Sequence, residues 1–73
     1  MVNYLKALVN KLREMRFMHG EMTQQDLATK VDVSRQTIFS IEKGKFNPSV
    51  KLALLIAKVF RVKVEEIFYL EEE

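Results

Sequence analysis

Cysteine and tryptophan are absent from this 73-residue chain, which also has a single histidine and only two glycines. Without cysteine there is no disulfide framework and no thiolate metal site, so a reducing cytoplasm is the economical location. One histidine nearly excludes nucleophile–base pairs and metal clusters, and two glycines do not make a glycine-rich phosphate loop. We therefore expect no catalytic site, no cofactor and no metal.

Long apolar runs are missing as well. No segment approaches the roughly 20 apolar residues that span a bilayer. The N-terminus is amphipathic and lacks the continuous apolar core and small-residue cleavage site of a signal peptide. The sequence predicts one cytoplasmic domain over residues 1–73, with no membrane partner and no small-molecule ligand.

Net charge is small, at +2, but it is unevenly distributed. Five of the ten acidic residues lie in the last nine positions, so residues 1–64 hold all 12 Lys and Arg against five acids, a net of +7. A basic body with an acidic tail fits a nucleic-acid binder that keeps one face clear of phosphate. An unevenly charged but merely solvated surface explains the charge equally well.

The most regular pattern lies in residues 23–44 and predicts two short helices joined by a tight turn, at about residues 24–31 and 35–43. Thr23 is placed to cap the first helix, with Asp26 completing a capping box three residues later. The second helix has start and stop signals of the same kind: Ser34 is placed to cap its start, and Gly44 follows its end.

Polar side chains gather at the start of the second of these helices, outside its apolar side. They are Ser34, Arg35, Gln36 and Thr37, followed one turn later by Ser40. Arg and Gln can each make two hydrogen bonds to a base edge, Arg to guanine and Gln to adenine. Such groups at the leading end of an exposed helix suit the major groove of DNA.

The segment resembles the helix-turn-helix of the Cro/CI-type, or XRE-family, repressors of bacteria, archaea and phages. The resemblance is carried by MTQQDLATKV, VSRQTIFSIEKGKFNPS and LALLIAKVFRVKVEEIF, and it covers roughly residues 9–68. It implies an all-α, compact, five-helix, lambda-repressor-like domain in a prokaryotic or phage-encoded protein. The second and third helices would form the helix-turn-helix.

The resemblance also implies a function and a set of contacts. The protein would be a sequence-specific regulator, a repressor that binds double-stranded DNA as a homodimer on a two-fold operator. The third helix would read bases with Arg35, Gln36 and Thr37, and with Ser40 as a further contact. Phosphates would be contacted by Gln24, Ser34, Lys43, Lys45 and Asn47. Gln24 matches the family glutamine that also braces the first residue of the recognition helix. Because Arg35 stands at that position, where several relatives have glutamine, we expect the brace to be altered and the preferred base to shift towards guanine.

The first helix is expected over residues 3–18, ending at Gly20, with His19 as a C-terminal cap or a surface residue. Residues 1–8 are an addition to the family pattern. They either lengthen the first helix or leave it at Asn10 as a separate arm. Their apolar side chains would bury either in the core or in a dimer contact.

A fourth, very apolar helix is expected at about residues 50–60, running through the centre of the domain. Its cap is Ser49 or, alternatively, Asn47 with Pro48 at the first helical position. A short fifth helix is expected at about 64–69, with residues 71–73 frayed. Its apolar edge is a candidate dimer interface, or else it covers the core; the residues are Phe68, Tyr69 and Leu70.

Besides Arg35, several residues depart from the family pattern, among them Lys63, which replaces a usual capping residue. Asp32 stands in the helix-turn-helix turn, and Arg61 after the fourth helix, where glycine is common. Asp tolerates the left-handed conformation better than most residues, so we expect the turn to be kept. Phe39 replaces a small polar residue and either packs against the protein or touches a thymine methyl.

Two other functions are compatible with the same fold. An antitoxin would bind both an operator and a partner protein, and the chain has little spare sequence for the latter. A protein-interaction adaptor would not read DNA at all. The presence of Arg35, Gln36 and Lys43 on the polar face favours the DNA-binding regulator over the adaptor.

Overall fold

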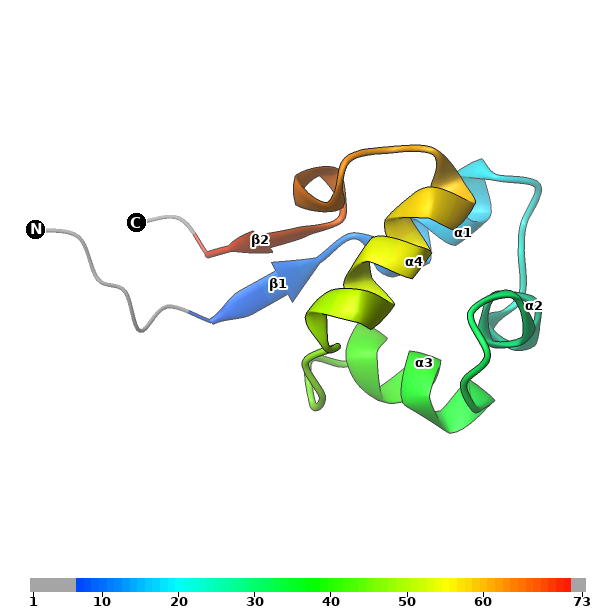
Figure 1. Cartoon of the computed structure of the whole chain (residues 1–73), viewed down its shortest axis with the longest axis horizontal. Coiled ribbons are helices and arrows are strands. Elements are labelled where there is room, and N and C mark those ends of the chain that lie inside the picture. Colours follow the sequence, from blue (N-terminus) through cyan, green and yellow to red (C-terminus); the bar gives the residue numbers. More distant parts are fainter. Residues whose placement is uncertain (1–6, 72–73) are drawn as a thin grey trace, which may run out of the picture.

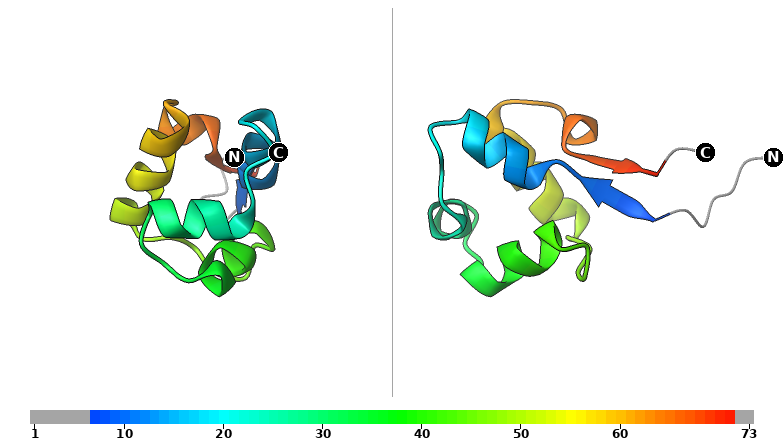
Figure 2. Two further views of the ribbon diagram at one scale, coloured as in Figure 1. Left: turned by 90° about the vertical axis from the view of Figure 1, so that its right-hand side faces the viewer. Right: turned by 180° about the vertical axis from the view of Figure 1, so that it is seen from behind.

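In a computed structural model that describes residues 7–71, the chain forms four α-helices, one 3₁₀ helix and a two-stranded sheet (Figures 1 and 2). In chain order these are β1 (Leu8–Asn10), α1 (Leu12–Met18), α2 (Gln24–Lys30), α3 (Arg35–Glu42), α4 (Val50–Phe60), η1 (Val64–Glu66) and β2 (Phe68–Leu70). The fold is therefore mostly helical, and the prediction of an all-α domain with five helices is wrong. The helices expected at 24–31, 35–43 and 50–60 are confirmed to within a residue.

The two ends of the described chain meet in an antiparallel sheet. Leu8 lies opposite Leu70, and Asn10 lies opposite Phe68. The expected helices at 3–18 and 64–69 are thus wrong in part: the first begins only at Leu12, and the last is a single 3₁₀ turn before β2. Inter-strand hydrogen bonds satisfy the backbone of both segments at once, whereas a short helical extension without packing is marginal. The rest of the proposed N-terminal extension, residues 1–6, and the last two residues of the proposed frayed tail lie outside the described residues.

Three helices begin with the side-chain caps that the sequence predicts. The Thr23 hydroxyl accepts from the Asp26 backbone N–H at 2.9 Å, and the Asp26 carboxylate accepts from the Thr23 N–H at 3.1 Å. Ser34 caps α3 in the same way, accepting from an N–H at 3.1 Å. Ser49, and not Asn47, caps α4. Because caps satisfy otherwise unpaired N–H groups, they fix where α2 and α3 begin.

Residues in the left-handed backbone conformation follow α2 and α4 and change the direction of the chain. Asp32 and Arg61 both have φ of 58°, so both adopt the left-handed conformation that glycine accommodates most easily. The expected left-handed turn at Asp32 is confirmed. At the end of α1, Met18 is the last helical residue and His19 is the C-cap, its Nδ1–H donating to the Met15 carbonyl oxygen at 2.8 Å.

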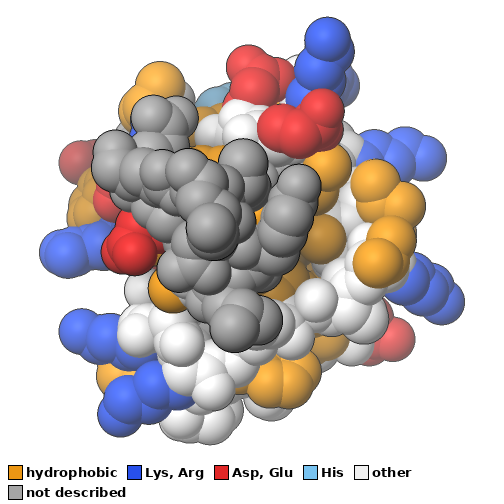
Figure 3. Space-filling model, turned by 90° about the vertical axis from the view of Figure 1, so that its left-hand side faces the viewer, with side chains coloured by type: hydrophobic (Ala, Val, Ile, Leu, Met, Phe, Trp, Pro, Cys, Tyr) orange, Lys and Arg blue, Asp and Glu red, His pale blue; other side chains and the backbone are white. Residues whose placement is uncertain are grey.

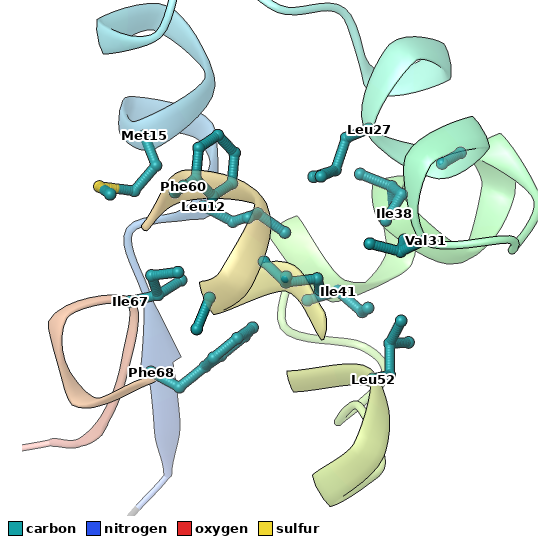
Figure 4. Packing of buried hydrophobic residues seen from close by; sticks show 13 residues of the cluster. Leu12, Met15, Leu27, Val31, Ile38, Ile41, Leu52, Phe60, Ile67 and Phe68 are labelled. Carbon is teal, nitrogen blue, oxygen red and sulfur yellow. The ribbon is translucent and has the colours of Figure 1, made fainter. Parts of the chain in front are cut away.

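One hydrophobic core joins all the helices and β2 (Figure 4). Its fully buried large side chains are Leu12, Leu27, Ile38, Ile41, Ile56 and Ile67. Helix α4 lies at the centre as expected, but its sequence is apolar on more than one face, and Val50, Leu54 and Leu55 are exposed. None of the helices in residues 7–71 is long and apolar enough to cross a membrane.

Candidate nucleic-acid interface

The start of α3 lies at the surface, at the end of the molecule away from the chain termini (Figures 1 and 2). Ile38 and Ile41 are buried and anchor one side of α3 to the core. Arg35 and Gln36 on the other side are exposed, and Thr37 is half-buried. The sequence pattern therefore produces a polar ridge on a rigidly packed helix.

Local hydrogen bonds organise this ridge, which we define as residues 34–37 and Ser40. The Ser34 and Thr37 hydroxyls lie 3.0 Å apart, and the Gln36 amide donates to the Ser40 hydroxyl at 3.3 Å. The Arg35 side chain makes no hydrogen bond or ion pair with any other residue of the described part of the chain. Its five donors are free for an outside acceptor.

Four of the five predicted phosphate-contacting residues flank the ridge, and the fifth, Ser34, is its first residue. Gln24 is the first residue of α2, Ser34 caps α3, and the other three follow the end of α3; they are Lys43, Lys45 and Asn47, all exposed. Lys43 Nζ lies 5.7 Å from the centre of the Phe39 ring. Phe39 is half-buried and therefore packs in part against the protein. The arrangement places donors at both ends of the ridge, where a sugar–phosphate backbone would pass on each side.

In the structure Gln24 does not brace Arg35, the first residue of α3. The Gln24 amide donates instead to Glu42 Oε1, at 3.2 Å. Glu42 is the last residue of α3, so the bond joins the start of α2 to the far end of the recognition helix. The first residue of α3 is left without it.

A buried ion pair that the sequence analysis missed lies beneath this contact. Arg16 Nε donates to Glu42 Oε2 at 2.6 Å, and Arg16 Nη2 donates to Oε1 at 2.9 Å. The third donor, Nη1, bonds to the Met22 carbonyl at 2.8 Å. Only 9% and 7% of the two side chains are exposed. No local spacing signals such a pair, because its members lie 26 positions apart on different helices.

Asn10 connects the strand region to the same helix. Its side-chain amide donates to the Ile41 carbonyl at 3.0 Å, and its Oδ1 accepts from the Leu12 backbone N–H at 3.1 Å. One side chain thus starts α1 and satisfies a carbonyl near the end of α3.

Among residues 7–71 no three His, Asp or Glu side chains are grouped to hold a metal ion.

A capped α2, a tight left-handed turn and an α3 with an exposed polar ridge define a DNA-binding helix-turn-helix domain. The chain belongs to the helix-turn-helix family, of the XRE or Cro/CI type, which matches residues 11–67. It is thus a DNA-binding helix-turn-helix transcriptional regulator and not an enzyme. The family resemblance seen in the sequence is confirmed.

Similar proteins come from archaea and bacteria. The chain is 58% identical over 64 residues to an uncharacterized HTH-type transcriptional regulator of Methanocaldococcus jannaschii, a match that covers 88% of this chain and 96% of that protein. It is 48% identical over 64 residues to the HTH-type regulator YgzD of Bacillus subtilis, with the same coverage. The crystal structure of the restriction-modification controller protein C.AhdI from Aeromonas hydrophila is similar in fold. It has a TM-score of 0.69 and 29% identity, over 75% of this chain and 82% of that one.

Proposed function

We propose that the protein, acting as a single domain, is a sequence-specific repressor that binds a two-fold operator as a homodimer. Helix α3 enters the major groove and presents its N-terminal residues to the base edges. The observation that carries the proposal is the exposure of Arg35 and Gln36 on a helix whose other side is anchored by Ile38 and Ile41. Repression is the simplest outcome, because a domain seated on an operator excludes polymerase without needing any further contact.

Each polar residue of the ridge has a role in this proposal. Arg35 makes two hydrogen bonds to guanine, and Gln36 makes two to adenine. The Thr37 and Ser40 hydroxyls, already paired with neighbours on α3, supply shorter-range contacts in the groove. The phosphate contacts come from Gln24, Ser34, Lys43, Lys45 and Asn47. They set the position of α3 on the duplex without choosing its sequence.

The proposed homodimer uses the face that carries β1 and β2. Tyr69 and Leu70 are 37% and 55% exposed, whereas Phe68 is only 8% exposed and belongs to the core. The expected interface is therefore reduced to Tyr69 and Leu70. Figure 3 views the molecule from this side and draws hydrophobic side chains among charged ones at the surface, without identifying single residues. Burying Tyr69 and Leu70 against a second copy would remove exposed apolar area and place two α3 helices on one DNA.

Selection from a random DNA pool tests the proposal. The purified protein is expected to retain duplexes that share a half-site repeated as an inverted pair, with centres about 10–10.5 base pairs apart. Footprinting on a selected duplex should then show protection of both half-sites on one face of the DNA. A retained pool with no common sequence would contradict sequence-specific recognition and favour an adaptor with the same fold.

A further inference from the structure

We propose that Glu42 is a positioning residue of the DNA interface: it orients the Gln24 amide so that an N–H faces a DNA phosphate, and it leaves Arg35 to read bases independently. This inference rests on the proposed function, since it assigns the source of a phosphate contact in the same complex. It differs from the family expectation, in which the glutamine at the start of α2 braces the first residue of the recognition helix.

The orientation follows from the chemistry of the two groups. An ionised carboxylate only accepts hydrogen bonds, whereas a glutamine amide has a donating and an accepting end. At 3.2 Å from Glu42 Oε1, Gln24 is held with its NH₂ group toward the carboxylate. The opposite orientation would bring two oxygens together. Nε2 carries a second hydrogen, which remains available to a phosphate oxygen.

Glu42 is itself held in place and electrically balanced. Arg16 donates to both of its oxygens, at 2.6 and 2.9 Å, and the pair is almost fully buried. Its negative charge is thus offset beside a site that would receive a phosphate. Arg16 also bonds to the Met22 carbonyl at 2.8 Å, immediately before the cap of α2. One cluster therefore sets the position of Gln24 relative to α3.

Arg35 lies outside this cluster. Its side chain makes no hydrogen bond or ion pair with another residue between positions 7 and 71, so the Gln24 and Arg35 side chains share no hydrogen-bond partner, although both line one surface hollow with Arg16. Substitutions at sites without shared partners add in free energy, whereas substitutions within one network couple. The structure therefore assigns hydrogen-bond coupling to Gln24 and Glu42, and no such coupling to Gln24 and Arg35.

A double-mutant cycle on a selected operator tests this assignment. Gln24→Ala is made in the wild type and in the variant Arg16→Met with Glu42→Leu, which replaces the ion pair by apolar side chains and leaves no unpaired buried charge. We expect Gln24→Ala to weaken binding about tenfold in the wild type and less than twofold in the apolar background. An undiminished tenfold loss in that background would overturn the proposal. In a second cycle, the fold-losses in operator affinity caused by Gln24→Ala and by Arg35→Ala should multiply.

Arg16→Gln with Glu42→Gln is the second background, for the case that the apolar pair does not fold in urea-unfolding controls; it too leaves no unpaired buried charge. The amide introduced at position 42 can turn either an oxygen or an N–H toward Gln24, so it does not fix the orientation of the Gln24 amide. The effect of Gln24→Ala on binding should again shrink. The matched control is Gln25→Ala, because that amide donates within α2 to the Thr29 hydroxyl at 3.1 Å. It should change binding less than twofold in every background.

Ethylation of operator phosphates separates positioning from a merely structural role. For one phosphate, ethylation should weaken binding by the wild type but should have no effect on binding by Gln24→Ala. The proposal requires the same phosphate, and no other, to cease to matter in the Arg16→Met, Glu42→Leu variant. A uniform weakening at all phosphates would overturn it. If the wild type selects no operator at all, the proposed function fails instead, which is a different result from an intact operator complex without coupling.

Discussion

The Asp26 carboxylate shows how a single side chain holds the start of α2. It accepts the Thr23 backbone N–H at 3.1 Å, and this hydrogen bond is the main reason that the pKa of Asp26 lies below its ordinary value of 3.8. A side-chain hydrogen bond with Thr23 and the nearby positive charge of Lys30 act in the same direction. The ionised form is thus favoured by the folded state.

Stability should therefore depend on pH through Asp26. Because the folded-state pKa is below the unfolded one, the contribution is fully present above pH 3.8 and is lost as the pH falls through the folded-state pKa. Asp26→Asn should lower the urea midpoint at neutral pH, and the difference from wild type should shrink below pH 3.8. A difference that stays constant across this range would contradict the role of the charge.

How much the sequence predicts at this scale depends on the distance between partners. Caps join residues three apart, so Thr23 with Asp26, and Ser34 with its own helix, were predicted from spacing and are confirmed. The partners Arg16 and Glu42 lie on helices whose packing no local pattern specifies. The redirected bond of Gln24 depends on that pair and was missed for the same reason.

At the scale of the element, the C-cap of α4 is an arginine in the left-handed backbone conformation. Arg61 has φ of 58°, and its backbone N–H donates to the Lys58 carbonyl at 3.2 Å. A residue with a β-carbon adopts this left-handed conformation at a cost of roughly 1 kcal/mol, which glycine does not incur. The helix therefore ends correctly but with strain that the sequence could relieve.

Replacing that residue should stabilise the protein. Arg61→Gly is expected to raise the free energy of unfolding by about 0.5–1 kcal/mol, because it removes the left-handed penalty at the helix end. Urea unfolding at neutral pH measures the change. The control is Lys58→Gly in the last turn of the same helix, which should destabilise by up to about 1 kcal/mol. Equal destabilisation by both variants would show that the conformation of Arg61 carries no penalty.

The elements that the sequence analysis misassigned lie at the two ends of the described chain. Apolar residues at helical spacing predicted one helix through Leu8 and Leu12, but residues 8–10 form a three-residue strand whose members are all half-buried, so no alternation marks it in the sequence. The choice is made by a partner distant in sequence, since Asn10 pairs with Phe68 across the sheet. Strand pairing of this kind depends on the assembled fold, whereas α2 and α3 carry their own start and stop signals.

On the scale of the whole molecule, the recognition helix and the sheet lie in different regions. The start of α3 is at the end away from the termini, and the sheet is on the side that carries them (Figures 1 and 2). A second copy bound at β2 would therefore leave the polar ridge open. This separation allows the domain to associate and to contact DNA at the same time.

Disruption of the proposed interface should dissociate the protein without unfolding it. Leu70 is 55% exposed, so Leu70→Glu is expected to change the free energy of unfolding of one protomer by less than about 0.5 kcal/mol. Sedimentation should show a shift from dimer to monomer, with a loss of operator affinity. Met18→Glu, at a 74% exposed position on α1, is the matched control and should remain dimeric. A wild type that sediments as a monomer on and off DNA would refute the dimer.

The most direct test of base reading by the start of α3 compares a selected operator with random DNA of equal length, at two salt concentrations. Arg35→Ala should cost about 1–3 kcal/mol on the operator and little on random DNA, because the guanidinium reads a base. Lys45→Ala should weaken binding to both duplexes alike and reduce the salt slope by about one, because it contacts phosphate. Equal losses for Arg35→Ala on the two duplexes would contradict the account.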